Sequence, residues 1–273
     1  FALRTAMTKA MKRTMSMHEG PDATGLCDAL YRRTLRTLIS IVAQREIPGR
    51  MLRGGWPIDG AYYFELHDGT PIKPKEISAL QSALDKLVAS DAKIEEKKAP
   101  YAEVLSYFEK HKLSLSASLL RTRVVGDHVL VHEIEGAWRL AIFPLLTSTG
   151  GVEQAHPKLI SHGRGIFVVW QNPSGPLDAF EPSMSLMASF ADHKAWGKMM
   201  GVECVGELNA LRAVGRELAD FVLHAEFRQE GKLAGIAQAI RDRNANASTE
   251  ESVGVICIAG PTSSGKTTFA TKL

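Results

Sequence analysis

A glycine-bracketed loop near the carboxyl end constrains the fold of this chain more than any other feature. Residues 252–273 read SVGVICIAGPTSSGKTTFATKL. The apolar, β-branched run Val253–Ile258 predicts a buried parallel strand. It leads directly into Gly260–Thr267, which matches the phosphate-loop pattern GxxxxGK(S/T) at every fixed position. A strand that passes through such a loop into a helix predicts the beginning of an α/β domain that binds nucleotide.

Phosphate binding is the chemistry that this loop predicts. Gly260 and Gly265 permit backbone conformations that turn successive N–H groups towards phosphate oxygens. Lys266 places a positive charge near the β- and γ-phosphates and is the expected catalytic residue. Thr267, with Thr268 as the second choice, is the expected ligand of Mg²⁺. The predicted site for ATP and magnesium therefore comprises Gly260, Pro261, Thr262, Ser263, Ser264, Gly265, Lys266, Thr267 and Thr268.

The residues around the loop add a family resemblance. Ile258–Phe269, IAGPTSSGKTTF, resembles the phosphate loop of the uridine kinase and phosphoribulokinase family. The resemblance implies transfer of the ATP γ-phosphoryl group to a hydroxyl of a nucleoside or sugar. Such transfer also needs an acidic residue, but only seven residues follow Lys266 and none is acidic. We therefore expect either a piece of a longer kinase, inactive alone, or a vestigial loop.

The region before the loop predicts an α+β fold. Hydrophobic periodicity favours alternating helices and short strands, followed by a long helical segment. The expected helices are 26–44, 75–90, 101–110 and 184–243, the last broken near Gly201 and Gly215, and the expected strands are 61–66, 93–98, 129–134, 138–143 and 166–170.

A second resemblance covers about residues 26–160. Gly55–Leu66, Lys73–Glu76 and Thr147–Gly150 are similar to the editing, or second additional, domain of threonyl- and alanyl-tRNA synthetases. Fusion of such a domain to a uridine kinase-like domain is a known arrangement, and residues 190–243 resemble its helical connector. The expected parts are a basic segment (1–25), the editing-like domain (26–182), the connector (183–243), a linker (244–251) and the start of the kinase domain (252–273).

The hydrolytic residues of the editing family are missing from this sequence. That family carries an HxxxH helix and a later Cys/His pair, whereas the corresponding stretches here read Arg32–Thr37 (RRTLRT) and Ala141–Leu146 (AIFPLL). Editing hydrolysis is therefore not expected, since fold does not transfer function when the site is absent. The alternative to the kinase is a non-catalytic nucleotide-binding factor that associates with RNA or a ribonucleoprotein, such as the mitochondrial ribosome.

Two clusters of polar residues leave their roles open. Arg32, Arg33, Arg36, Arg45, Arg50 and Arg53 are either a face that contacts RNA phosphates or an ordinary solvated helix face. His128 and His132 imitate a metal-binding pair, but the apolar residues between them favour a strand. On a strand their Cα atoms lie about 13 Å apart, too far for one metal ion. We therefore expect no metal site there.

The remaining features concern compartment and partners. Residues 1–18 are basic and lack acidic residues, with Leu3, Met7, Met11 and Met15 at helical spacing. This pattern fits either the remainder of a mitochondrial targeting segment or a helix that packs on the domain; the protein is otherwise expected in the cytoplasm. A net charge of +3 does not by itself indicate nucleic-acid binding. The sequence has no apolar run that would span a membrane, and Cys27, Cys204 and Cys257 form no CxxC pair.

Overall fold

The computed structural model describes residues 21–122, 126–170, 180–212, 216–246, 252–260 and 262–273. The basic segment 1–18, the predicted break at Gly215 and the site residue Pro261 lie outside these ranges. The chain forms two compact units, Phe1–Glu207 and Leu208–Leu273, which are described separately. None of the described helices combines the length and apolar character needed to cross a membrane.

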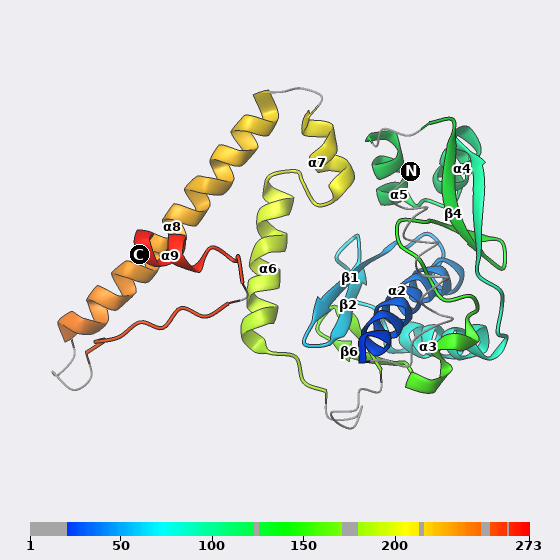
Figure 1. Ribbon diagram of the computed structural model, residues 1–273, viewed down its shortest axis with the longest axis horizontal. Coiled ribbons are helices and arrows are strands. Elements are labelled where there is room, and N and C mark those ends of the chain that lie inside the picture. The colour runs from blue at the N-terminus through cyan, green and yellow to red at the C-terminus, as the bar shows by residue number, and fades with distance from the viewer. Residues whose placement is uncertain (1–20, 123–125, 171–179, 213–215, 247–251, 261) are drawn as a thin grey trace. The chain divides into compact units, whose positions relative to one another are not determined.

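The first unit contains a four-stranded antiparallel sheet with the order β1-β2-β7-β6 (Figure 1). Its strands are β1 (Leu52–Ile58), β2 (Ala61–Leu66), β6 (Lys158–His162) and β7 (Gly165–Val169). A register shift between Gly54 and Trp56 produces a bulge in β1. The bulge fits the sequence, because Gly54 and Gly55 adopt positive φ angles that a side chain strongly disfavours.

Both faces of this sheet are covered by helices. Phe64 and Val168 point to a core built with α2 (Pro21–Glu46) and α3 (Pro74–Ala89). Their neighbours along the strands point to the opposite face, where Tyr63 and Phe167 pack beside α6 (Met184–Met199). The two-residue period of a strand therefore explains why β2 and β7 are almost continuously apolar.

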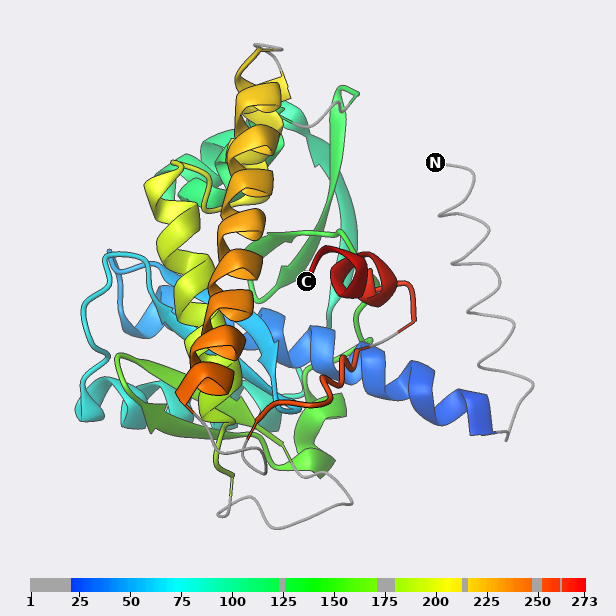
Figure 2. The ribbon, with the colours of Figure 1, turned by 90° about the vertical axis from the view of Figure 1, so that its left-hand side faces the viewer.

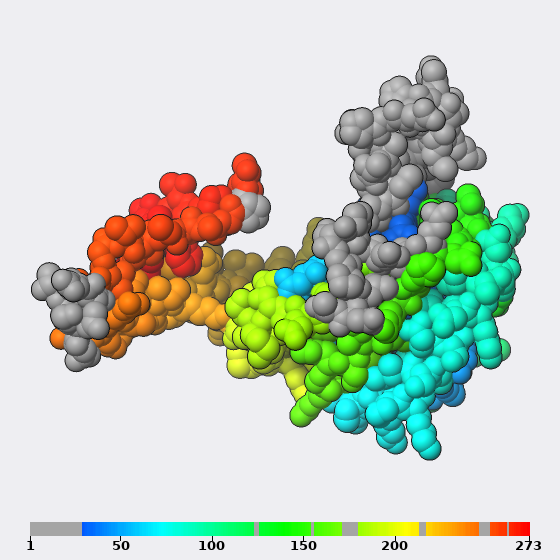
Figure 3. All heavy atoms as spheres, turned by 90° about the horizontal axis from the view of Figure 1, so that it is seen from below, coloured from blue at the N-terminus to red at the C-terminus, as the bar shows by residue number. Residues whose placement is uncertain are grey.

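Helices α2 and α3 lie together on their face of the sheet and bury regularly spaced apolar side chains. In α3 these are Leu80, Leu84, Leu87 and Val88. The same helix packs against the 3₁₀ helix η1 (Gly150–Ala155) and against β6. Figure 3 shows the atoms of α3 in cyan beside the green atoms of this later segment.

A second, three-stranded sheet has the order β3-β4-β5. It consists of β3 (Glu95–Pro100), β4 (His128–Ile134) and β5 (Ala137–Leu140). A tight turn at Glu135 and Gly136 joins β4 to β5. Helices α4 (Tyr101–Lys110) and α5 (Ser114–Thr122) pack on it around a separate core. Phe108 is the largest fully buried side chain in that core, which also contains Trp138.

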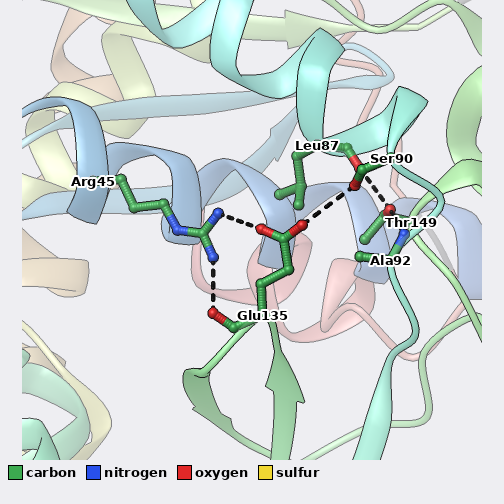
Figure 4. A network of polar contacts seen from close by, with 6 residues as sticks. All are labelled: Arg45, Leu87, Ser90, Ala92, Glu135 and Thr149. Carbon is green, nitrogen blue, oxygen red and sulfur yellow. Dashed lines mark hydrogen bonds and ion pairs between the residues drawn. The ribbon is translucent and has the colours of Figure 1, made fainter.

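A polar network ties α2 and the end of α3 to the three-stranded sheet and to the loop at Thr149 (Figure 4). Arg45 of α2 forms an ion pair with Glu135 in the β4–β5 turn at 2.8 Å. Thr149 is completely buried; its hydroxyl donates to the carbonyl of Leu87 at 2.6 Å and accepts the N–H of Ala92 at 2.8 Å. The TSTG sequence therefore fastens the end of α3 to the segment that leads into β3.

Helix α6 is attached to the first unit by aromatic and ionic contacts. Phe190 lies 4.8 Å from the ring of Trp56 in β1 and 5.5 Å from that of Tyr63 in β2. Lys194 forms an ion pair with Glu65, a nearly buried residue of β2. The predicted helical connector thus begins on the surface of the first sheet.

The second unit contains helices and an extended segment, and its beginning lies within α7 (Val205–Leu211). Figure 2 shows α8 (Arg216–Asn246) as one long helix, followed by a strand-like but unpaired segment and the short helix α9 (Lys266–Lys272). Asn244 holds the extended segment by accepting the N–H of Val253 at 2.6 Å. Lys272 of α9 forms an ion pair with Glu230 of α8.

Candidate functional site

The predicted phosphate loop folds as a tight turn before a helix. Ser263 and Gly265 have φ angles of 61° and 81°, which lie in the left-handed region. Helix α9 then begins at Lys266, with Gly265 as its N-cap residue. A Cβ atom built on Gly260 would lie 3.0 Å from Oγ of Ser264 and 3.7 Å from Cδ of Lys266. The lysine stem therefore folds back over the first glycine of the motif.

The structure places most of the predicted loop residues around this turn. Thr262, Ser263 and Ser264 form the turn itself, and Thr267 and Thr268 occupy the first turn of α9. The carbonyl of Thr267 accepts the hydroxyl of Thr271 at 2.9 Å. The turn thus brings Lys266 and Thr267 to the helix start, where the motif requires them.

The prediction of a buried strand before the loop is wrong. Val253–Ile258 is extended, but it has no strand partner among the described residues of the second unit. Val255 is 81% exposed, and Cys257, expected to be a small buried side chain, is exposed as well. The sequence pattern identifies a segment that can be buried between strands, but burial also requires neighbours, which the described part of this unit does not provide.

A second candidate site is a groove in the first unit, between α2 and β1 on one side and α5 and β5 on the other. It consists of two cavities of about 240 and 370 Å³ that share Ser40, Leu115 and Arg139 among their lining residues. We call it the α2–α5 groove. Its apolar wall includes Leu115 and Leu119 of α5.

The groove lies where the two stretches that replace the editing motifs meet. Arg36 and Thr37 from the first stretch line the larger cavity together with Ile142 from the second. Close by, the hydroxyl of Thr34 accepts the N–H of Leu146 at 2.9 Å. The fold therefore brings both stretches together, although neither carries His or Cys. No cluster of potential metal ligands occurs among the described residues.

The structure gives most of the arginine cluster partners within the fold. The structure gives Arg45, Arg50 and Arg53 carboxylate partners, in Glu135, Glu76 and Glu203 respectively. Arg32 lies over the ring of Trp170, and Arg33 lies over that of Phe143. Most of these side chains are therefore structural contacts, so the cluster is not a uniformly solvated helix face.

Arg36 is the exception, because its side chain is exposed and lines the groove. The described part of the chain gives it no carboxylate partner. Its stem lies over the bulge in β1: a Cβ atom on Gly55 would lie 2.6 Å from Cγ of Arg36. Gly55 thus makes room for this arginine.

Sequence reasoning missed Arg139, the second cation of the groove. Its guanidinium donates to Oγ and the carbonyl oxygen of Ser40, at 2.9 and 2.8 Å, and to the carbonyl oxygen of Trp138 at 2.8 Å. Burial lowers the pKa of Arg139 to about 10, because it removes water from the charged guanidinium. Tyr107 acts in the opposite direction, whereas the positive charge of Arg45 lowers the pKa further. A lone arginine in a hairpin strand carries no local motif, so only the tertiary structure reveals it.

The two histidines lie on β4, as the apolar residues between them predict. His128 is exposed, whereas His132 is buried. Nε2 of His132 lies 2.9 Å from the carbonyl oxygen of Phe143. This histidine therefore fixes the segment that follows β5 rather than binding a ligand.

Comparison with known proteins supports the synthetase resemblance in part. No protein-family model matches the chain. The threonine–tRNA ligase of Gluconacetobacter diazotrophicus is 25% identical over 127 residues, which are 46% of this chain and 20% of that enzyme. The threonine–tRNA ligase of Methylibium petroleiphilum is 25% identical over 130 residues, 47% of this chain and 20% of that enzyme. The chain thus spans about a fifth of the length of these curated relatives, and its α+β fold is compatible with an editing-like domain.

Proposed function

We propose that the loop Gly260–Thr267 binds the terminal phosphates of ATP with Mg²⁺. The observation that carries the proposal is the complete motif in a turn with left-handed Ser263 and Gly265, with Lys266 at the helix start. In this arrangement backbone N–H groups surround an anion while Lys266 reaches the β- and γ-phosphates. Thr267, or less favourably Thr268, contributes a hydroxyl to Mg²⁺.

We further propose that the protein containing this loop is a uridine kinase-like phosphoryltransferase. The resemblance of Ile258–Phe269 supports transfer of the γ-phosphoryl group to a hydroxyl of a nucleoside or sugar. Lys266 would neutralise charge on the transferred group, and the loop would hold the phosphates in line with the acceptor. The acid that activates the acceptor hydroxyl is not among the residues that follow Lys266.

Lys266→Ala tests the binding step in the full-length protein. Calorimetric titration with ATP and Mg²⁺ is expected to show at least about tenfold weaker binding, because a charge-assisted contact to phosphate is lost. Lys272→Ala is the matched control, since it removes the same charge from the same helix but only breaks the pair with Glu230. Equal affinity in Lys266→Ala and the parent protein would contradict the assignment.

Acceptor-dependent release of ADP tests the transfer step. The full-length protein is expected to release ADP with at least one member of a panel of nucleosides and pentose phosphates, and Lys266→Ala is expected to abolish that release. If ATP binds but no acceptor stimulates ADP release, the kinase proposal fails while the binding proposal stands.

A second candidate is a non-catalytic nucleotide-binding factor that associates with RNA or a ribonucleoprotein, for example in mitochondria. The observation that favours it is the similarity to threonine–tRNA ligases, whose name states that they act on tRNA, together with the loss of the editing residues. Co-purification of RNA or ribosomal particles with the full-length protein, without acceptor-dependent ADP release, is the result that this candidate predicts.

A further inference from the structure

The lining of the α2–α5 groove is rich in basic residues and contains no acidic ones. The residues that line its two cavities include Arg36, Arg50, Arg53, Lys112 and Arg139, and none of the described lining residues is acidic. Arg50 and Arg53 are neutralised by glutamates from outside the lining. Three cations remain to give the groove a positive potential.

Arg139 is held in place with donors to spare. Its contacts to Ser40 and Trp138 use three of the five N–H groups that a guanidinium offers, and the Tyr107 hydroxyl is a further hydrogen-bond partner. The described part of the chain supplies no carboxylate to this partly buried charge, although an unpaired buried charge is costly. Burial lowers the pKa of Arg139 to about 10, so its guanidinium still remains protonated at neutral pH.

Arg36 reaches the same space from the opposite element. It lies on α2 and lines the larger cavity, which Arg139 on β5 also lines. The bulge at Gly54 and Gly55 accommodates its stem. Two planar guanidinium groups from different elements that face one cavity form a geometry suited to the oxygens of a phosphate.

The smaller cavity adds a requirement for a hydrogen-bond donor on the ligand. Gln44 lines this cavity, and its Oε1 is buried without a hydrogen-bond partner among the described residues. An unsatisfied buried acceptor of this kind destabilises a fold, and a turn of the Gln44 side chain into the cavity would let a ligand hydroxyl satisfy it. Lys112, at the turn between α4 and α5, lines the same cavity.

We propose that the α2–α5 groove binds a sugar monophosphate, with its phosphate between Arg36 and Arg139 and its hydroxyl-bearing body towards Gln44. The combined cavities suit a small metabolite. This proposal concerns the first unit alone and does not depend on nucleotide binding by the loop of the second. It assigns binding, not catalysis, to the groove.

Ribose 5-phosphate is the first probe, titrated by calorimetry into full-length Lys266→Ala protein without ATP. Saturable binding in the micromolar to millimolar range is expected. Removing Arg36 (Arg36→Ala) is expected to weaken it at least about tenfold. Arg33→Ala is the matched control, because Arg33 lies on the same helix but stacks on Phe143 and does not line the groove. Equal effects of the two substitutions would overturn the proposal.

Further ligands separate the contributions of phosphate and sugar. Ribose is expected to bind far more weakly than ribose 5-phosphate, and ribonate, which carries a carboxylate, is expected to bind more weakly as well. Gln44→Leu is expected to weaken binding of ribose 5-phosphate but not of inorganic phosphate. Ribonate binding as tightly as ribose 5-phosphate would overturn the choice of phosphate, and displacement of ribose 5-phosphate by a short RNA at much lower concentration would assign the groove to nucleic acid instead.

Ser116→Glu provides a test that retains both arginines. Ser116 of α5 lines both cavities and is only partly buried. A carboxylate at this position is expected to pair with the groove cations and abolish phosphate binding, while thermal unfolding stays cooperative. Undiminished binding to Ser116→Glu would contradict the location of the site.

Discussion

The phosphate loop and the α2–α5 groove are two candidate anion sites built in opposite ways. Eight successive residues, Gly260–Thr267, define the loop, which lies in an exposed stretch after an unpaired segment. The groove has no local motif, and its residues come from α2, β1, α5 and β5 around a packed core. A contiguous motif can therefore be read without its surroundings, whereas a site assembled by tertiary contacts can be recognised only after the fold is known.

The packed surroundings of the groove and the exposed surroundings of the loop should also differ in how much a substitution changes the free energy of unfolding. This difference is the largest effect that we predict. Leu38 on α2 is fully buried in the main core, so Leu38→Ala is expected to lower the free energy of unfolding by about 2–5 kcal/mol. Val255 is 81% exposed, so Val255→Ala is expected to change it by less than about 0.5 kcal/mol. Urea unfolding followed by tryptophan fluorescence reports on the first unit, to which all four tryptophans belong, and far-ultraviolet circular dichroism reports on both units. A large effect of Val255→Ala would mean that the segment is packed in solution.

The buried threonine of the TSTG sequence predicts the next largest effect. Thr149→Val keeps the shape of the side chain but removes the hydroxyl that joins Leu87 to Ala92. The free energy of unfolding is expected to fall by about 1–3 kcal/mol, because the N–H of Ala92 loses its acceptor and the carbonyl of Leu87 keeps only the hydroxyl of Ser90 as a side-chain donor. Thr147→Val, at an exposed position two residues earlier, is the control and is expected to be nearly neutral. If both variants lower the free energy of unfolding equally, the replacement of a hydroxyl by a methyl group, rather than the loss of the network in Figure 4, causes the destabilisation.

Some of this architecture follows from sequence because it depends on local periodicity. Strand β2 and helix α4 occupy the predicted residues 61–66 and 101–110, and α3 differs from its prediction by one residue at each end. Their apolar side chains recur with the period of the element, so the pattern alone indicates which face is buried.

Other elements depend on contacts that no short window of sequence contains. Strand β1 includes Gly54, Gly55 and Pro57, which individually disfavour a strand, and it forms because β2 pairs with it across a bulge. Helix α5, with the sequence SLSASLLRT, was missed because its serines weaken the helical pattern. Strand β3 is mostly charged and lies at 95–100 rather than 93–98, since its register is set by β4. Arg139 could not be assigned to a site for the same reason.

Substitution of glycines with positive φ angles compares the two sites further. The expected changes in the free energy of unfolding are smaller, and each substitution is expected to affect the binding of one ligand. Gly55→Ala is expected to lower the free energy of unfolding by about 1–2 kcal/mol through its positive φ angle, and to weaken binding of ribose 5-phosphate because the new methyl displaces Arg36. Gly60→Ala has a similar φ of 79° but no neighbour within 4 Å, and Gly60 lines neither cavity, so it measures the backbone strain alone. Equal effects of both variants on ribose 5-phosphate binding would exclude the role of the bulge in positioning Arg36.

Gly265→Ala makes the corresponding change in the phosphate loop. It has a φ of 81° and open space where the methyl would lie, so no side chain is displaced. Binding of ATP with Mg²⁺ is expected to weaken because the backbone leaves the left-handed region that orients the N–H groups. Tryptophan-monitored unfolding of the first unit is expected to be unchanged. The pair of substitutions thus separates the two sites, since each is expected to impair one ligand and spare the other.

The smallest predicted effect concerns the start of α3, where Glu76 pairs with Arg50 of the groove. Glu76 accepts the N–H of Lys73 at 2.7 Å and pairs with Arg50, and these contacts, chiefly the backbone hydrogen bond, hold its pKa below the ordinary value. Because the folded-state pKa is lowered, the stabilisation is complete above the unfolded-state pKa of about 4.3 and is lost as pH falls through the folded-state value. Glu76→Gln is therefore expected to cost about 0.5–1 kcal/mol at pH 7 and progressively less in acid.

Urea unfolding measured at several pH values between neutrality and about 3 tests this dependence against the unfolded-state pKa. Glu103→Gln is the control, because Glu103 is an exposed first-turn glutamate of α4 on the second sheet. Its difference from the parent protein is expected to stay small throughout. If the cost of Glu76→Gln does not shrink in acid, the carboxylate charge is not what stabilises this helix start.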